Sequence, residues 1–277
     1  MERANCRMNG GGGLDGGGDS GSSSGRITLE DLESFTEDQL SDSDSETPKE
    51  EDQMMDDEQQ DGLLRYWQDA ARGHQVEVPR DMAEPIHQIT SNNEGQHNRE
   101  LVPFTLISRK EKCGTVLYER RHYEKAYWAC ITVREDTYEQ SICYGFMRLM
   151  KYICQQNTAG NYLGLTIPIL TIIRTDESHT VLSRDVTVAY YLPTEHQTQP
   201  PLPSDLDIRI EEWPATNVYT RAFAGATNEV TIINQINTMA QVLDNPAGHL
   251  NDSFIVAGYT NPAAANRQNE IWFLELP

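Results

Sequence analysis

The chain has 277 residues, a formal net charge of −21 and five cysteines. This excess of acid argues against binding to nucleic acid or to an anionic membrane, because both require clustered lysine and arginine. No apolar run reaches 18 residues, so we expect no membrane span. The first residues lack the apolar stretch of a signal peptide, and the cysteines form no C-x-x-C pair. We therefore expect free thiols in a reducing, cytoplasmic setting.

The acidic charge is concentrated in a head, residues 1–60. Residues 1–61 hold 18 acidic and 4 basic residues, a net charge of −14. The head is also rich in glycine and serine, and such a composition buries too little apolar surface to fold, so we predict disorder. Within it, residues 27–40 place Leu29, Leu32 and Phe35 among acids. This segment is either a transient helix or a protein-binding segment that folds on contact.

Residues 61–100 are predicted to be a linker that carries one short helix. The stretch 61–73 (DGLLRYWQDAARG) has helical character, and Leu63, Leu64 and Trp67 could dock on the rest of the chain. Residues 80–98 are polar, and we expect them to be irregular. The folded domain is expected over 101–277, where alternating apolar residues begin.

A pattern in this domain returns after 90 positions. Residues 118–128 precede a helix that opens Thr137-x-Glu139-x-x-Ile142, and residues 208–218 precede one that opens Thr227-x-Glu229-x-x-Ile232. The two helices, about 138–156 and 229–243, have apolar residues at the same spacing. Each is followed by two strand-like runs, at 163–174 and 185–192 and then at 254–259 and 270–276.

This repetition predicts an α+β domain. Two β-α-β-β halves related by a pseudo-twofold axis would form an antiparallel sheet with two flanking helices. The proline-rich stretch 193–203 would connect the halves, since proline is excluded from central strands.

The sequence offers no constellation of catalytic residues. There is no Walker lysine, no G-x-G-x-x-G on a strand-to-helix turn and no H-E-x-x-H. We therefore expect a binding protein rather than an enzyme.

His122 is the one histidine on a predicted strand. It is either an ordinary strand residue or a metal ligand. Its counterpart 90 positions later is Glu212, so the two halves would share a scaffold but not this site.

The first helix carries the other candidate residues. Phe146, Met147 and Met150 have core spacing, yet a cleft lined by methionine and aromatic rings would suit a flat apolar guest. Lys151, like Arg148, could meet carboxylates at the rim of such a cleft, or could belong to a solvated face.

Several blocks resemble the SOUL/heme-binding protein family. They cover about 101–277 in the same order as in the family: Tyr118-Glu-Arg-Arg-His-Tyr…Trp128, Leu165-Thr-Ile-Pro-Ile169, Pro200-Pro-Leu-Pro-Ser204, Ala257-Gly-Tyr-Thr-Asn-Pro262 and Arg267-Gln-Asn-Glu-Ile-Trp272. Leu165 stands where the family usually has methionine, and Cys143 where some members have a basic residue.

The resemblance implies a distorted antiparallel β-barrel that binds heme or another tetrapyrrole noncovalently in a groove beside the first helix. It further implies His122 as a possible axial iron ligand and Lys151 as a residue near the heme edge. We therefore expect a heme carrier or buffer. The alternative is a protein-interaction module that has lost heme affinity and recruits a partner through its acidic head.

Overall fold

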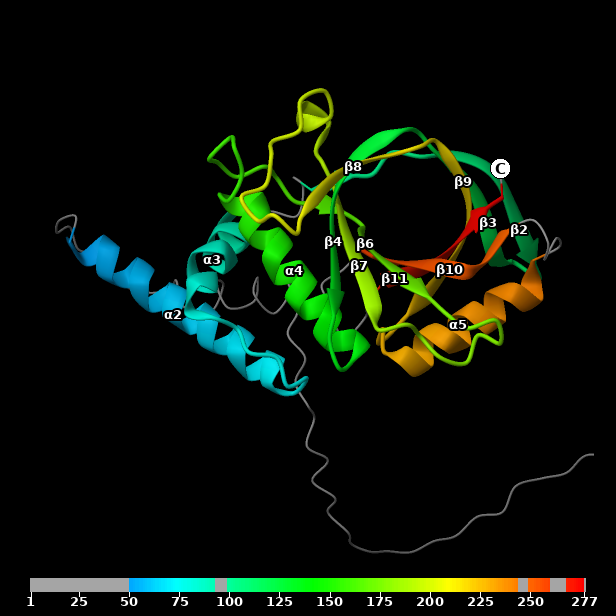
Figure 1. Cartoon of the computed structure of the whole chain (residues 1–277), viewed down its shortest axis with the longest axis horizontal. Helices are drawn as coiled ribbons and strands as arrows, with labels where there is room; N and C mark the ends of the chain where they lie inside the picture. The colour runs from blue at the N-terminus through cyan, green and yellow to red at the C-terminus, as the bar shows by residue number, and fades with distance from the viewer. Residues whose placement is uncertain (1–49, 93–98, 244–248, 260–267, 277) are drawn as a thin grey trace, which may run out of the picture.

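The computed structural model describes residues 50–92, 99–243, 249–259 and 268–276 (Figure 1). The head up to residue 49, with its 27–40 segment, lies outside these residues. The helices are α2 (Glu50–Arg72), α3 (Ala83–Asn92), α4 (Tyr138–Cys154) and α5 (Glu229–Val242), with short 3-10 turns at Arg80–Met82 and Thr194–His196. The strands are β1 (Glu100–Leu101), β2 (Thr105–Lys112), β3 (Thr115–Tyr123), β4 (Ala126–Arg134), β5 (Thr166–Ile167), β6 (Ile169–Arg174), β7 (Asp185–Tyr191), β8 (Arg209–Trp213), β9 (Thr216–Ala224), β10 (His249–Gly258) and β11 (Gln268–Glu275).

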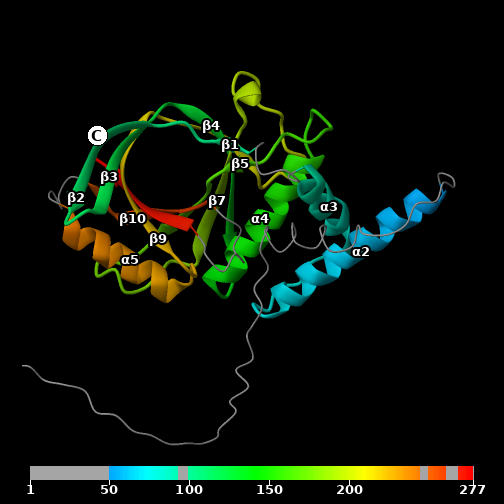
Figure 2. The ribbon, with the colours of Figure 1, turned by 180° about the vertical axis from the view of Figure 1, so that it is seen from behind.

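One antiparallel sheet dominates the structure and curls into a half-barrel, outside which α4 and α5 lie (Figures 1 and 2). Its nine strands follow the order β2-β3-β9-β11-β10-β6-β7-β4-β8. From the central pair β10·β6, one side reads β6, β7, β4, β8 and the other reads β10, β11, β9, β3. Since α4 follows β4 and α5 follows β9, the arrangement has pseudo-twofold symmetry. The predicted fold class is confirmed.

The two helices begin alike. Thr137 caps α4 through a capping box with Gln140, and Asn228 caps α5 through a capping box with Thr231. The second cap is therefore Asn228 and not Thr227, one residue later than the spacing of 90 suggests. Such caps satisfy backbone N–H groups that the helix itself leaves unbonded.

The outer face of the sheet is apolar and is covered by these helices. Under α4, Ala129, Ile131 and Val188 belong to a cluster with Met147 and Leu149. A second cluster joins Ile232 and Ile236 of α5 to outer side chains of β10 and β11, among them Phe254 and Phe273. The α4 helix approaches β7 closely: a Cβ at Gly145 would lie 2.7 Å from Cγ2 of Val188.

Residues 61–92 are ordered and packed, whereas residues 80–98 were predicted to be irregular. Residues 83–92 form α3, and the predicted 61–73 helix is part of the longer α2, which begins at Glu50 within the stretch 1–60 that was predicted to be disordered. Leu64, Val76, Val78, Met82, Ile86 and Ile89 are buried in the same cluster as the residues of α4, with Leu63 and Trp67 packed against it. In both views α3 lies beside α4 on the side away from the half-barrel (Figures 1 and 2). We call residues 61–92 the α4 cover.

Candidate functional site

The α4 helix holds four of the five predicted site residues. Met147 is 6% exposed and Met150 is fully buried. Phe146 and Lys151 are half-buried. Met147 lies one turn from both Tyr144 and Lys151, so these three side chains share a face of the helix.

This face of α4 meets the α4 cover along its whole length. The contacts start in the first turn of α4 and end at its C-terminus. They are Gln140 Nε2 to Gln75 O (3.4 Å), Glu77 N to Tyr144 Oη (3.3 Å), Lys151 Nζ to Asp81 Oδ2 (2.5 Å), Cys154 Sγ to Pro85 O (3.4 Å) and Gln155 Nε2 to Glu84 Oε1 (3.4 Å). The stripe of α4 that carries two of the predicted residues, Met147 and Lys151, is therefore occupied by the chain's own N-terminal segment.

Both basic groups in the second half of α4 have acidic partners. The ammonium of Lys151, 20% exposed, pairs with the 64% exposed carboxylate of Asp81. Arg148 binds Asp205 through two nitrogens, at 2.7 and 2.6 Å, and also reaches Asp207 at 2.6 Å. The hydrogen bond to Asp205 is the main reason that the pKa of Arg148 is raised, and the same bond lowers the pKa of Asp205.

His122 lies on β3, as predicted, but away from the α4 set. Its Nδ1 is 2.7 Å from Oδ1 of Asn217 on β9, and its Nε2 is 3.5 Å from Oε1 of Glu124. The outer face of β3 belongs with α5, because Tyr118 is part of the α5 cluster. Glu212 on β8, the counterpart of His122 in the second half, pairs with Lys125 at 3.2 Å.

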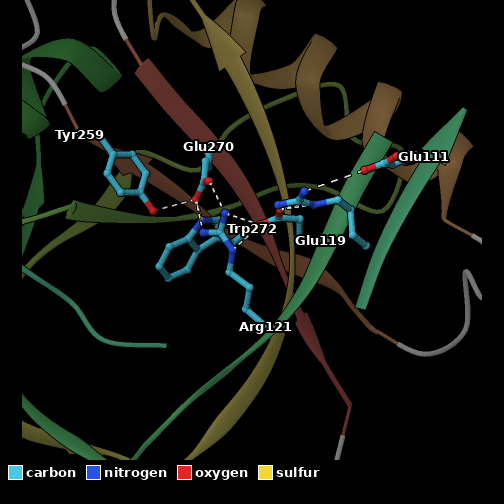
Figure 3. Close-up of polar contacts among 7 residues, drawn as sticks. Glu111, Glu119, Arg121, Tyr259, Glu270 and Trp272 are labelled. Atoms are coloured by element: carbon cyan, nitrogen blue, oxygen red, sulfur yellow. Dashed lines mark hydrogen bonds and ion pairs between the residues drawn. The ribbon is translucent and has the colours of Figure 1, made fainter. Parts of the chain in front are cut away.

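The inner face of the sheet carries a buried network of charged and aromatic side chains (Figure 3). Arg121 binds Glu270 through two nitrogens, at 3.0 and 2.8 Å, and binds Glu119 at 2.7 Å. Oε2 of Glu270 also accepts hydrogen bonds from Tyr259 Oη and from Trp272 Nε1, both at 2.8 Å. Such bidentate, charge-assisted bonds fix both partners in one orientation.

Arg121 and Glu119 keep their charges despite burial. Burial of Arg121 opposes its ionisation, but the bonds and charges of Glu270 and Glu119 outweigh it, and the pKa of Arg121 is raised. Burial likewise opposes ionisation of Glu119, yet the hydrogen bonds from Arg121 and Arg109 lower its pKa. Burial raises the pKa of neighbouring Tyr123 to about 12. These groups therefore stay in one protonation state near neutral pH and serve as a fixed frame.

Beside this frame, aromatic rings line a cavity of about 90 Å³. Trp128 stacks on Trp213 and Tyr123 stacks on Trp272, in both cases with ring centroids 4.8 Å apart. Tyr191 packs edge-on to Trp128. The indole N–H groups of Trp213 and Trp272 bond to carboxylates of the protein, so the cavity presents ring faces.

The sequence held signals for the cover that the prediction missed. Met82, Ile86 and Ile89 are spaced four and three apart, as on one face of a helix. Val76 and Val78 alternate as in an extended segment. The aromatic cavity had no such signal, because its side chains come from strands far apart in the sequence.

Comparison with known proteins identifies the family. The model of the SOUL heme-binding protein family matches residues 99–274, more than half of the chain. The chain belongs to this family. It is 28% identical over 185 residues to heme-binding protein 1 of Xenopus laevis, covering 66% of this chain and 92% of that protein. It is 31% identical over 160 residues to heme-binding protein 2 of Mus musculus, covering 57% and 78%.

Likeness to solved structures is weaker. The crystal structure of the EcmrR C-terminal domain aligns with a TM-score of 0.39 and 16% identity over 57% of this chain and 95% of that one, which is too low to carry an argument. The α4 cover, residues 61–92, lies before the family match. None of the helices in the described part of the chain is long and apolar enough to cross a membrane.

Proposed function

We propose that this SOUL-family chain binds heme or a related tetrapyrrole noncovalently at the covered face of α4, as a carrier or buffer rather than an enzyme. The observation that carries the proposal is the family match over 99–274, which spans both α4 and α5 and nearly all of the sheet. In the described part of the chain Cys113, Cys130 and Cys154 are free thiols, which supports a reducing, cytoplasmic setting.

The residues of α4 fit such a ligand chemically. Phe146, Met147 and Met150 offer an aromatic ring and soft thioethers to an apolar macrocycle. Lys151 offers an ammonium group to a carboxylate, which would be costly to bury unpaired. Heme, when bound, supplies an iron centre, and the chain supplies the apolar surface and the counter-charge.

His122 has local geometry suited to a metal ligand, but it lies on β3 away from the covered face of α4, so it would ligate a heme bound beside β3 and not one bound at that face. Ligating histidines commonly donate the N–H of the other ring nitrogen to an oxygen, which fixes the ring and its tautomer. Asn217 Oδ1, at 2.7 Å from Nδ1, can accept that bond and leave the lone pair of Nε2 for a metal. Glu124, the neighbour of Nε2, is 82% exposed and free to turn into solvent.

A hemin titration of the full chain, followed by the Soret band, tests the proposal. We expect saturable binding that Phe146→Asp weakens about tenfold or more, because a charge then meets the macrocycle. His122→Ala tests whether heme binds beside β3 instead: a shift of the Soret maximum that the control His196→Ala does not cause would assign the iron to His122.

The variants separate the site from the ligand. An unchanged spectrum in His122→Ala would remove the axial assignment and leave the carrier function in place. If hemin binds neither the wild-type chain nor variants with the α4 cover loosened, the proposal is wrong and the protein-interaction alternative takes its place.

A further inference from the structure

The α4 cover offers α4 the same chemistry that the proposed ligand would offer. Met82 and Ile86 supply apolar surface, and both are almost completely buried. Asp81, next to Met82, supplies a carboxylate at 2.5 Å from the ammonium of Lys151. An apolar body with a carboxylate at its edge is also the chemical description of a propionate-bearing tetrapyrrole. The cover thus resembles the ligand in chemical character.

The same side chains cannot serve both partners at once. Met147 and Met150 are buried, so no macrocycle reaches them while the cover is in place. Lys151 has Asp81 as its partner and would exchange it for a ligand carboxylate. Binding at this face and closure of the cover therefore exclude each other.

We propose that the α4 cover is a built-in competitor that sets the affinity of this chain for its ligand. This inference rests on the proposed function, because it concerns the regulation of the same site. In the closed form α4 binds residues 75–92, and in the open form it presents Met147, Met150 and Lys151. The apparent dissociation constant is then the intrinsic constant divided by the open fraction.

The cover is built to be displaced rather than to be permanent. The Asp81–Lys151 ion pair, which joins it to α4, lies in part at the surface, where such pairs contribute little to stability. Its closure depends mainly on buried apolar groups such as Met82 and Ile86, which a ligand of similar character can replace. It also lies outside residues 99–274, the part that matches the family, so the sheet fold of the family does not include it.

Two variants of the full chain loosen the cover by different routes. Asp81→Lys changes an exposed residue and replaces an attraction to Lys151 with a repulsion. We expect hemin to bind it about two- to fivefold more tightly. Met82→Asp places a charge in the apolar contact and should tighten binding about tenfold or more.

Asp69→Lys is the matched control. Asp69 lies on α2, is 69% exposed and pairs with Arg72, so the charge change and the exposure resemble those at Asp81. We expect its hemin affinity to equal that of the wild type.

Hydrogen–deuterium exchange gives a readout that is independent of the heme spectrum. Saturating hemin should speed the exchange of amides 75–92 in the wild type by about tenfold or more, because the bound state holds the cover open. Amides of β10 and β11 should keep their protection. If Met82→Asp also lowers the protection of the β10 and β11 amides, that variant disturbs the whole fold. The hemin affinity of Asp81→Lys is then the measurement that tests the competitor.

The outcomes distinguish this inference from the function on which it rests. The competitor is refuted if the loosened variants bind hemin as the wild type does and hemin leaves the exchange of amides 75–92 unchanged. The α4 site still stands in that case, provided that Phe146→Asp weakens binding. If hemin binds none of them, the proposed function itself fails.

Discussion

Two packed regions on opposite sides of the sheet are held by different forces. Outside α4, the α4 cover is attached by buried apolar side chains, a few peripheral hydrogen bonds and the partly exposed Asp81–Lys151 pair. On the inner face, Arg121, Glu119 and Glu270 form a buried network whose carboxylate also anchors Trp272 and Tyr259 (Figure 3).

This difference separates a contact that can open from a frame that cannot. Apolar contacts are non-directional and can be replaced by any surface of similar character. Breaking a buried ion pair costs much free energy, because each partner left alone is an uncompensated charge. The outer face is therefore suited to exchange its own segment for a ligand, and the inner face to hold aromatic walls at fixed positions.

The largest expected effect is the loss of the inner frame. Arg121→Ala leaves Glu270 and Glu119 with fewer partners in a buried setting, and we expect it to lower the free energy of unfolding by about 3–5 kcal/mol. Urea unfolding, followed by tryptophan fluorescence, measures this. A loss below about 1 kcal/mol would contradict the contrast between the faces.

The matched control is Arg134→Ala. Arg134 is 70% exposed and lies 3.5 Å from Asp185, so its removal should change the free energy of unfolding by less than about 1 kcal/mol. A large loss there would mean that exposure does not separate the two classes of ion pair in this chain.

Acid should weaken the inner frame. The pKa of Glu119 is lowered from its usual 4.5 by Arg121 and Arg109, against the opposing effect of burial. A carboxyl group whose pKa is lower in the folded state contributes stability that is present above pH 4.5 and lost as the pH falls below it. As the pH is lowered past 4.5, the urea concentration at the unfolding midpoint should therefore decrease. The decrease should be smaller in Glu119→Gln, which has no carboxyl group to protonate at this position. Glu177→Gln, an exposed control, should leave the acid dependence unchanged.

Much of the fold was predictable because it depends on local pattern. The apolar periodicity of 138–156 and 229–243 predicted both main helices, and alternation predicted the strands around them. The pairing of β3 with β9 and of β4 with β8 was beyond local pattern, because it joins segments about 90 residues apart. The packing of 75–92 was missed because its polar surroundings masked the spacing of Met82, Ile86 and Ile89.

The sequence predicted the candidate residues of α4 but not the segment that packs against them. The stripe on α4 made Met147, Met150 and Lys151 candidates, and the strand pattern made His122 a candidate, which lies elsewhere, on β3. Whether such a stripe faces solvent, ligand or another segment depends on tertiary packing, and here the partner is a segment that precedes the family match. The buried network could not be predicted, since Arg121 and Glu270 are 149 positions apart.

The smallest expected effect compares the two helix caps. Thr137→Ala and Asn228→Ala each remove one capping oxygen and should each cost about 1 kcal/mol of stability in urea unfolding. Gln140, which completes the cap of α4, also bonds to the backbone of Gln75 in the cover at 3.4 Å. Thr137→Ala should therefore also speed amide exchange at 75–78, whereas Asn228→Ala should not. Equal exchange in the two variants would mean that the cover closes independently of the first turn of α4.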